Sequence, residues 1–158
     1  MTSIDFFGSF NVDFFKNRKF VIDERKYVNA DFFIKDLLQA LDNPSIYFFN
    51  NQPKLYNSNY TLHSEYNGDI YKNETILDHA FIARKLFNIN LDSQFCIFRD
   101  GTCTKQDWYD FDIVIIIELL PSGISTEYDG IITVKNREKV FFRCKYKSYT
   151  DKTEYFKL

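Results

Sequence analysis

The stretch Asp112-Ile-Val-Ile-Ile-Ile-Glu-Leu-Leu120 decides the fold, because it contains the longest unbroken apolar run of the chain. This run is far shorter than the roughly 20 residues that span a membrane, and it is typical of a buried strand. A strand that is apolar on both faces predicts a sheet covered on both sides. Alternation puts Ile113, Ile115 and Ile117 on one face, and Val114 and Ile116 on the other.

Strands separated by turn signals are expected throughout the C-terminal part of the chain. Asp100-Gly101 and Asp129-Gly130 mark bends, as does Pro121-Ser-Gly123. Short links of this kind favour antiparallel pairing. The expected strands are Gln94–Arg99, Trp108–Leu120, Tyr128–Lys135, Lys139–Lys147 and Thr153–Lys157.

Two helices are expected in the N-terminal half. The first covers residues 29–41, where apolar residues return every three or four positions and Pro44 ends the pattern. The second begins near Thr75, because Thr75 and Asp78 have the spacing of a capping box, and ends at Asn88. Each helix has an apolar face that would pack on the sheet.

The remaining N-terminal segments carry weaker signals. Residues 19–28 and 45–49 are expected to be strands, with a short helix before Phe15. Residues 50–73 form a long polar loop, which either contains a hairpin at Asn67-Gly68 or has a functional role. We therefore expect a single α+β domain over residues 1–158, with two main helices packed on a mainly antiparallel sheet of about five or six strands.

The composition favours binding surfaces over reaction centres. The chain has 18 Phe, 11 Tyr and one Trp, but only two His, three Cys and five isolated Gly. Aromatic rings contribute strongly to cores and interfaces, whereas phosphate-binding loops need several glycines and zinc sites need clustered His or Cys. The sequence therefore predicts no enzyme activity, no cofactor and no bound metal.

Charge and cysteine content bear on partners and location. The net charge of −2 argues against a nucleic acid or a membrane as the overall partner. Three cysteines without paired spacing suit reduced thiols, and the first residues lack the basic and apolar segments of a secretion signal. We expect a cytoplasmic protein.

A group of acids interleaved with aromatic residues is the first candidate site. If a strand starts at Trp108, Asp110 and Asp112 point the same way and could hold Mg²⁺ or act in acid–base chemistry. The neighbouring rings favour an acidic protein-binding patch over a metal site. The patch comprises Asp107, Trp108, Tyr109, Asp110 and Asp112.

A second pattern combines Glu127-Tyr-Asp-Gly130 with Phe141-Phe-Arg-Cys-Lys145. These segments resemble the metal-binding core of the PD-(D/E)xK nucleases. The resemblance implies that Asp129 is the first metal ligand and Lys145 the family's lysine, but Arg143 stands where the second acid belongs. Because a cation there repels a metal ion, we interpret the pattern as a plain hairpin. The alternative function is a metal-dependent nuclease or hydrolase with a degenerate acidic site, at Asp129 or in the Asp107–Asp112 group.

The same hairpin carries a basic strip. Arg143, Lys145 and Lys147 share one strand face, and Lys135 and Arg137 lie near the turn. Such a strip could contact phosphates and stack bases, which makes a nucleic-acid-binding protein a further alternative. A solvated outer face, or protection of a sheet edge, would also explain these residues.

Charge is divided unequally along the chain. Residues 89–130 carry two basic and eight acidic side chains, whereas residues 131–158 carry eight basic and three acidic ones. If the two segments pair in one sheet, much of this charge cancels. If they face apart, the acidic segment would attract a cationic partner.

The leading hypothesis is a non-catalytic protein-binding module. Its most concrete form is a small bacterial immunity or inhibitor protein that masks the surface of a toxin or effector domain, such as a cationic nuclease. The acids of the first candidate site would steer association, and its rings would supply buried area. The second choice of partner-binding residues is a group of tyrosines in the long loop, Tyr56, Tyr60 and Tyr66.

Overall fold

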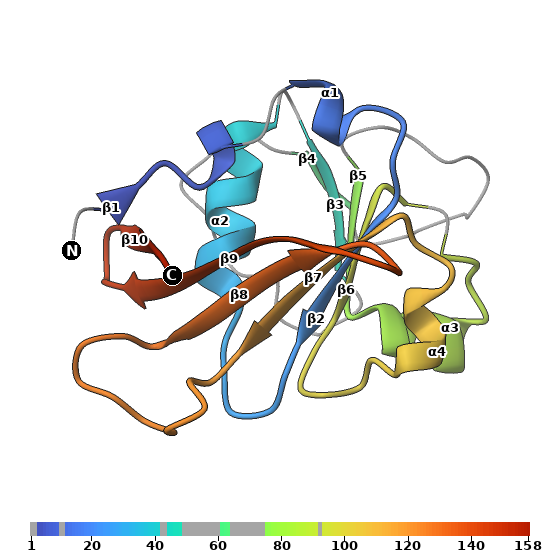
Figure 1. The fold of residues 1–158 in the computed structure, drawn as a ribbon. Coiled ribbons are helices and arrows are strands. Elements are labelled where there is room, and N and C mark those ends of the chain that lie inside the picture. The colour runs from blue at the N-terminus through green and yellow to red at the C-terminus, as the bar shows by residue number, and fades with distance from the viewer. Residues whose placement is uncertain (1–2, 10–11, 42–43, 49–60, 64–74, 92) are drawn as a thin grey trace.

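The computed structural model describes residues 3–9, 12–41, 44–48, 61–63, 75–91 and 93–158, which form one mixed β-sheet with helices on both sides (Figure 1). The strand order is β1-β10-β9-β8-β7-β2-β6-β5-β3-β4. The strands are β1 (Ser3–Ile4), β2 (Phe20–Glu24), β3 (Ser45–Phe48), β4 (Thr61–His63), β5 (Thr75–Asp78), β6 (Phe95–Phe98), β7 (Ile113–Glu118), β8 (Gly130–Lys135), β9 (Val140–Ser148) and β10 (Thr153–Lys157). The helical segments are η1 (Phe7–Ser9), α1 (Val12–Phe15), α2 (Asp31–Ala40), α3 (Ala80–Phe87) and α4 (Lys105–Trp108).

The sheet has a parallel half and an antiparallel half, which meet at β7. β2 pairs in parallel with β6 and β7, and β5, β3 and β4 continue the parallel half. On the other side of β7, the strands β8, β9, β10 and β1 are added in antiparallel order. Parallel neighbours require crossover connections, and α2, α3 and α4 lie within these connections.

The predicted sheet of five or six mainly antiparallel strands with two main helices is therefore wrong. The structure has a ten-stranded mixed sheet, in which β2 lies between two parallel partners from much later in the chain. Turn signals indicate pairing between neighbours in sequence, but they carry no information about pairing at long range. The parallel half was for that reason not predictable from local patterns.

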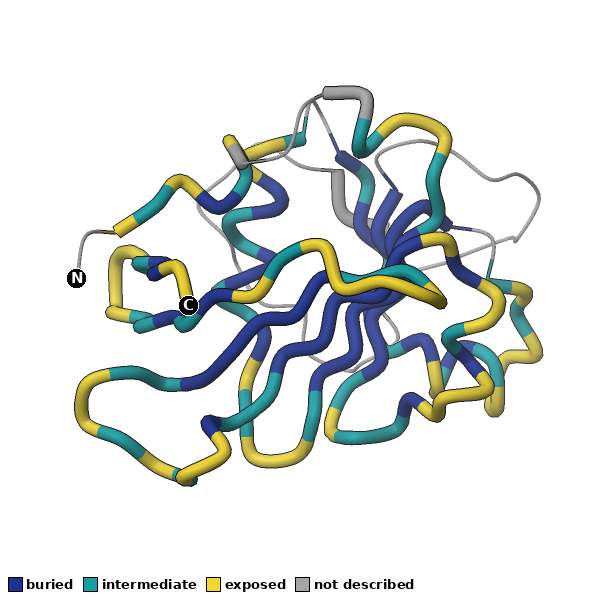
Figure 2. The backbone as a smooth tube through the Cα atoms, in the orientation of Figure 1, coloured by how far each residue is buried: buried dark blue, intermediate teal, exposed yellow. Residues whose placement is uncertain are grey.

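The core consists of two apolar layers, one on each face of the sheet. Phe33, Ile34 and Leu37 of α2 pack on one face against the odd-numbered isoleucines of β7. Ala80 and Ala83 of α3 pack on the other face, together with Val114 and Ile116 of β7. The predicted alternation of the run Ile113–Ile117 is thereby confirmed, and Figure 2 shows the central strands buried along their length.

The second helix begins later than predicted. Thr75–Asp78 forms the buried strand β5, and α3 starts at Ala80, after His79 in a left-handed conformation with φ 60°. The capping-box spacing of Thr75 and Asp78 is misleading here, because a short apolar run fits a buried strand as well as a helix. The predicted end of the helix at Asn88 is confirmed.

The strand predicted from Trp108 begins only at Ile113. The residues before it form α4, which Thr104 and Asp107 cap at its N-terminus in a reciprocal capping box. Asp110 and Asp112 therefore do not share a strand face, since both precede the strand.

The strand predicted over residues 19–28 is shorter, since β2 ends at Glu24, and the predicted loop 50–73 contains the strand β4, Thr61–His63. The first helix, the short helix before Phe15 and the strand Thr153–Lys157 are present as α2, α1 and β10. The predicted hairpin at Asn67-Gly68 lies outside the described residues. Within the part of the chain that the structure describes, no helix is long and apolar enough to cross a membrane.

Candidate functional site

Three charged side chains lie at the carboxyl edge of neighbouring parallel strands. Glu24 ends β2, Asp78 ends β5, and Arg99 directly follows β6, which lies between those two strands. The helix after β2 packs on one face of the sheet, and the helices after β5 and β6 pack on the other. A point where the connections change face in this way is the usual ligand site of open sheets with parallel strands.

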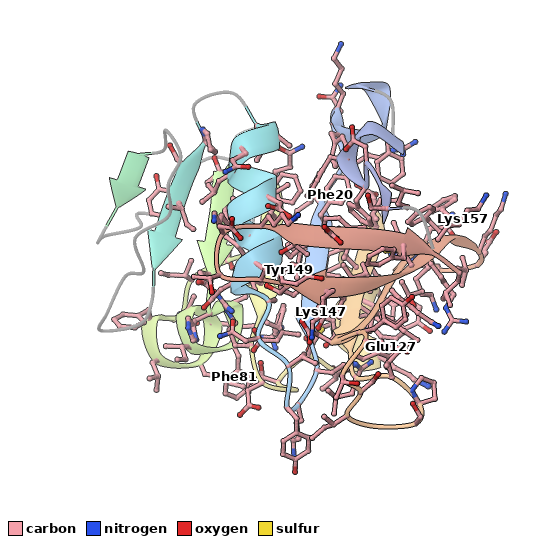
Figure 3. All side chains as sticks on the ribbon, turned by 90° about the vertical axis from the view of Figure 1, so that its left-hand side faces the viewer. Phe20, Phe81, Glu127, Lys147, Tyr149 and Lys157 are labelled. Carbon is pink, nitrogen blue, oxygen red and sulfur yellow. The ribbon has the colours of Figure 1, made fainter. Side chains whose placement is uncertain are left out.

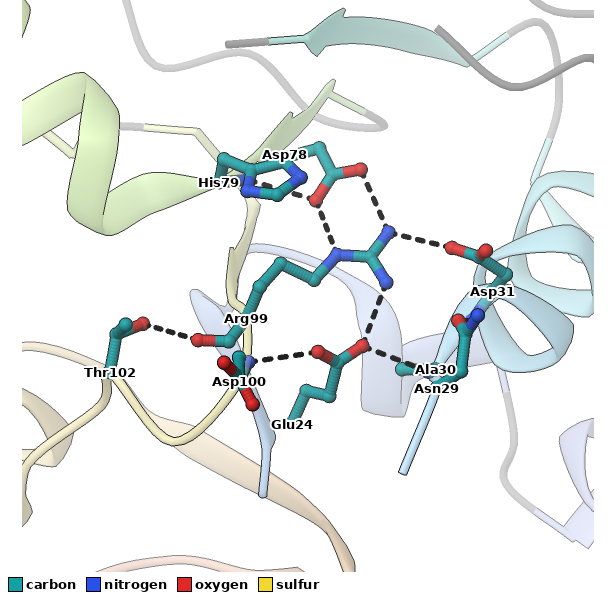
Figure 4. A network of polar contacts seen from close by, with 9 residues as sticks. All are labelled: Glu24, Asn29, Ala30, Asp31, Asp78, His79, Arg99, Asp100 and Thr102. Carbon is teal, nitrogen blue, oxygen red and sulfur yellow. Dashed lines mark hydrogen bonds and ion pairs between the residues drawn. The ribbon is translucent and has the colours of Figure 1, made fainter. Parts of the chain in front are cut away.

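The Arg99 guanidinium is the centre of an ion-pair network (Figure 4). It donates hydrogen bonds to both carboxylate oxygens of Asp78, at 2.8 and 2.9 Å, and to Oε2 of Glu24 at 2.8 Å. Asp31, at the start of α2, lies 2.9 Å from the same guanidinium. Only 13% of the Arg99 side chain is exposed. This one side chain therefore connects β2, β5, β6 and α2.

Charges and backbone groups surround the Arg99 network. Burial on its own would lower the pKa of Arg99, but hydrogen bonds and charges from Asp78 and Glu24 raise it above its ordinary value. The amides of Ala30 and Asp100 donate to Glu24 at 2.9 and 2.8 Å. With Asp31 included, three carboxylates surround one guanidinium, so this edge has an excess of two negative charges.

A cavity of about 430 Å³ opens beside the Arg99 network. Asp31 belongs to both, because its carboxylate pairs with Arg99 and its side chain lines the cavity. The start of α2, the end of β9 and the loops after β2 and β7 form the walls. Phe32, Tyr128 and Tyr146 give the lining a strongly aromatic character. Cavities of this size and character are typical of binding sites.

Asp129 is the second carboxylate of the cavity. Its Oδ1 lies 3.1 Å from the Lys147 ammonium, and its Oδ2 accepts a hydrogen bond from the Ser148 amide at 2.7 Å. Burial raises the pKa of the neighbouring Tyr146, and the charges of Asp129 and Glu24 raise it further. The cavity thus combines a neutral phenol with two carboxylates.

The cavity is flanked by two apolar side chains that stand out into solvent. Ile124 is 94% exposed and Tyr27 is 86% exposed. Tyr27 also has a φ of 69°, in the left-handed region that large side chains rarely adopt. A large side chain in this conformation is strained, and it persists only where the surrounding structure holds it.

Asp107, from the acidic group predicted as a partner-binding patch, is buried and engaged within the fold. Its Oδ1 accepts a hydrogen bond from Arg84 at 2.7 Å, and its Oδ2 accepts the Thr104 amide at 2.8 Å. Burial would raise the pKa of Asp107, but the hydrogen bonds from Arg84 and Thr104 lower it overall.

A lowered pKa makes the contribution of Asp107 dependent on pH. Its stabilisation is present above the ordinary carboxyl range and is lost as the pH falls through its lower folded-state pKa. We expect Asp107→Asn to reduce the free energy of unfolding by about 1 kcal/mol at pH 7, and the difference from the parent chain to shrink towards pH 3. Urea unfolding at both pH values measures this difference, with the exposed Asp110→Asn as control. A difference that is the same at both pH values would contradict the role.

The rings of the predicted patch face cations within the same chain. The Lys135 ammonium lies 4.9 Å from the centre of the Trp108 ring, and the Arg137 guanidinium lies 5.4 Å from that of Tyr109. Asp110 and Asp112 are exposed, and Asp112 accepts a hydrogen bond from the Lys19 amide at 2.8 Å. The tyrosines of the second choice, Tyr56, Tyr60 and Tyr66, lie outside the described residues.

The segments that resemble a nuclease core form the β8–β9 hairpin, as we interpreted them. Asp129 pairs with Lys147, whereas the Lys145 ammonium lies 4.8 Å from the centre of the Tyr128 ring. Among the described residues, no group of three or more His, Cys, Asp or Glu side chains could hold a metal ion.

All three cysteine side chains are buried, and none of them is in a disulfide. Burial raises the pKa of Cys144 to about 12, and it raises the pKa of Cys103 further, with added effects from Asp23 and Asp107. Both thiols are therefore protonated at neutral pH and are poor nucleophiles.

Sequence reasoning missed the Arg99 network, although a signal for it exists. Each of its strands is a short apolar segment that ends in charge: Val21-Ile-Asp-Glu24, Ile76-Leu-Asp78 and Ile97-Phe-Arg99. Carboxyl ends of parallel strands meet at one edge of a sheet, so these charges would have been expected together once parallel pairing was assumed.

No family model matches this chain, and none of the curated proteins matches its sequence. The functional inference therefore depends on the geometry of the described residues.

Proposed function

We propose that this protein is a non-catalytic binding module for another protein, and that the cavity beside Arg99 is its contact site. The observation that supports this most directly is the position of Tyr27 and Ile124. These side chains are among the most exposed large apolar groups, and both flank one aromatic cavity. Exposed apolar side chains around a pocket are typical of protein interfaces, where they insert into the surface of the partner and act as anchors.

The protruding anchors favour a protein over a small molecule as the ligand. A small molecule is bound by side chains that enclose it, whereas Ile124 and Tyr27 extend into solvent. Once a partner covers them, their apolar surface leaves water, at about 25 cal/mol for each Å². The proposed partner segment therefore receives two apolar side chains and inserts one of its own into the cavity.

The charge of the site favours a partner segment with a basic side chain. The network of Arg99 with Glu24, Asp31 and Asp78 has two more negative than positive charges, and Asp31 brings this charge to the cavity wall. Complementary charge increases the rate of association and excludes acidic competitors. A cationic toxin or effector domain meets this requirement, and a cytoplasmic location is part of the same proposal. We infer a toxin or effector as the partner from the type of protein, namely a small domain with aromatic and acidic binding residues.

Paired substitutions at the cavity test the proposal. Affinity purification from the native cells should recover one stoichiometric partner, and calorimetry with that purified partner gives its affinity. Because central interface anchors contribute about 2 kcal/mol or more, we expect Tyr27→Ser with Ile124→Ser to weaken binding at least about 30-fold.

The matched control replaces apolar residues on α3. Leu86 is 76% exposed, and Phe81 is also exposed, so Leu86→Ser with Phe81→Ser removes similar groups away from the cavity. This control should leave the affinity within about threefold of the parent value. The proposal fails if no partner is recovered, or if the control weakens binding as much as the cavity variant does.

A further inference from the structure

A second, smaller cavity lies at the opposite end of β7 from the first one. It has a volume of about 210 Å³, and Val114 at the start of β7 forms part of its wall. The described residues that line it include three cations and no acid. Its charged and aromatic lining residues are Lys105, Trp108, Tyr109, Lys135 and Arg137.

The aromatic rings of this pocket are fixed in position. The Trp108 indole N–H donates a hydrogen bond to the Asp23 carboxylate at 3.1 Å, and Asp23 is fully buried. The Arg25 guanidinium pairs with the same carboxylate at 3.1 Å and lies 5.6 Å from the centre of the Trp108 ring. Arg137 donates to the Tyr109 carbonyl oxygen. The Trp108 ring and the Arg137 side chain are therefore pre-organised, which reduces the entropy lost on binding.

Cations and rings also alternate beyond the pocket, on the antiparallel half of the sheet. Lys135 lies on the same sheet face as its cross-strand neighbour Val114, and Arg143 and Lys145 face that side from β9. Lys145 repeats the pattern, since its ammonium lies over the Tyr128 ring. Three pairs of a cation with an aromatic ring thus lie on one face.

Helix α4 reaches this face beside Lys135, where the Trp108 ring lies. The apolar cluster of α3 and α4 extends over β7 but includes no residue of β8, β9 or β10. The opposite face of these strands packs against α2 through Cys144, Tyr146 and Tyr155. Figure 3 looks onto this half of the molecule, with Lys147 and Tyr149 near one end of the β9–β10 pair and Lys157 near the other.

We propose that this basic–aromatic face binds single-stranded nucleic acid, with Lys105, Lys135 and Arg137 contacting phosphates and the exposed Tyr109 ring stacking on a base. An open sheet face with aromatic and basic side chains is a recurrent surface for single strands, because every base has a flat face and every nucleotide a negative charge. A rigid duplex presents its bases only in grooves. The pocket residues named here share no member with the lining of the proposed protein-binding cavity, although Tyr128 at the far end of the face lines that cavity, so either proposal can fail without the other.

Trp108 supplies a direct readout, because it is the only tryptophan of the chain. The full chain would be titrated with a fluorescein-labelled oligo(dT) and an oligo(U) of about 12 nucleotides, with binding followed by anisotropy and by Trp108 fluorescence. We expect binding that quenches Trp108 and weakens steeply between 50 and 200 mM salt, as it does when phosphates release counterions. Absence of binding to both oligonucleotides at 50 mM salt would overturn the proposal.

Charge reversal at the pocket separates this site from general electrostatic attraction. Lys135→Glu with Arg137→Glu should weaken binding at least about tenfold and reduce the salt slope by about 1.4, since each contact to a single strand contributes about 0.7. The control, Lys85→Glu with Lys152→Glu, makes the same change of net charge at exposed positions elsewhere. Circular dichroism verifies that both variants fold. An equal loss of affinity in both variants would overturn the site.

Two further ligands test whether the pocket recognises a single strand, a duplex or a free phosphate ion. Inorganic phosphate at the oligonucleotide's phosphate concentration should leave Trp108 fluorescence unchanged, and a duplex of the same length should bind at least about tenfold more weakly. Equal responses to inorganic phosphate would assign the pocket to a free anion. Equal affinity for the duplex would show that the rings take no part. Either result contradicts single-strand binding.

Discussion

Replacement of Arg99 by methionine is expected to lower the free energy of unfolding by about 3–5 kcal/mol, the largest effect of any substitution considered for this chain. The loss of stability comes from the negative charge of the carboxylates that Arg99 neutralises. Glu24 and Asp78 are buried and share the Arg99 guanidinium, so its removal leaves carboxylates without a counter-ion away from water. Domains are stable by only about 5–15 kcal/mol, so this loss is a large fraction of the total stability.

Urea unfolding of the parent and variant chains measures this effect. A matched control is Lys152→Met, which removes the exposed cation of an ion pair with Glu154 at 2.8 Å and should leave the free energy of unfolding almost unchanged, because solvent screens such pairs. If Arg99→Met fails to fold, the triple variant with Glu24→Gln and Asp78→Asn should recover part of the stability, because the two most buried carboxylates of the network are then neutral. A loss of less than about 1 kcal/mol for Arg99→Met would contradict the role of the network.

Gly130→Ala is expected to have the second largest effect, a loss of about 2–3 kcal/mol. A Cβ atom at this position would lie 2.3 Å from the Glu118 carbonyl oxygen and 2.9 Å from the Tyr146 hydroxyl oxygen. The first neighbour is backbone of the paired strand β7, so the clash can be relieved only by a shift of β8. Tyr146 lines the cavity, and the shift should therefore alter the cavity wall as well.

The comparison with Gly123→Ala isolates the steric cause. Gly123 has a φ of 89°, but no atom lies within 4 Å of the added Cβ, so only backbone strain of about 1 kcal/mol is expected there. Thermal unfolding of the two variants should place Gly130→Ala clearly below Gly123→Ala. Equal melting temperatures would show that β7 and β8 are not packed as closely as the structure has them.

The sequence revealed the local elements of this fold better than their arrangement. The alternating run Ile113–Ile117 and the apolar face of α2 follow from periodicity, and both were predicted correctly. The parallel half was missed, because the pairing of β2 with β6 and β7 joins segments that are distant in the chain. No local turn signal can encode such a pairing, and the predicted sheet was therefore too small and mainly antiparallel.

The candidate site was harder to predict than the fold for a related physical reason. The composition indicated that aromatic side chains would contribute most to a binding surface, but it could not show which of them are exposed. Trp108 and Tyr109 were chosen for the acids beside them, whereas in the structure cations from the β8–β9 hairpin lie over their rings. The opposed charges of residues 89–130 and 131–158 meet in one sheet through β7 and β8, so part of this opposition is internal.

The cavity beside Arg99 could not be predicted from the sequence, because its walls come together only in the tertiary structure. Its two anchors lie in separate loops, Tyr27 after β2 and Ile124 after β7. Neither stands in a motif, and each would be an ordinary surface residue if its loop were considered in isolation. Their proposed function as anchors depends on the parallel pairing of β2 with β7, which brings the two loops to the same edge of the sheet.

Site-specific photo-cross-linking tests the central claim most directly. A benzophenone amino acid in place of Ile124 would be activated in the native cells, and Leu86 on α3 would carry the same probe as an equally accessible control. Recognition through the cavity predicts one covalent adduct with a single protein from position 124, lost when Tyr27→Ser is added, and no such adduct from position 86. The same adducts from both positions, or none from position 124, would contradict the claim that this edge of the sheet binds a protein partner.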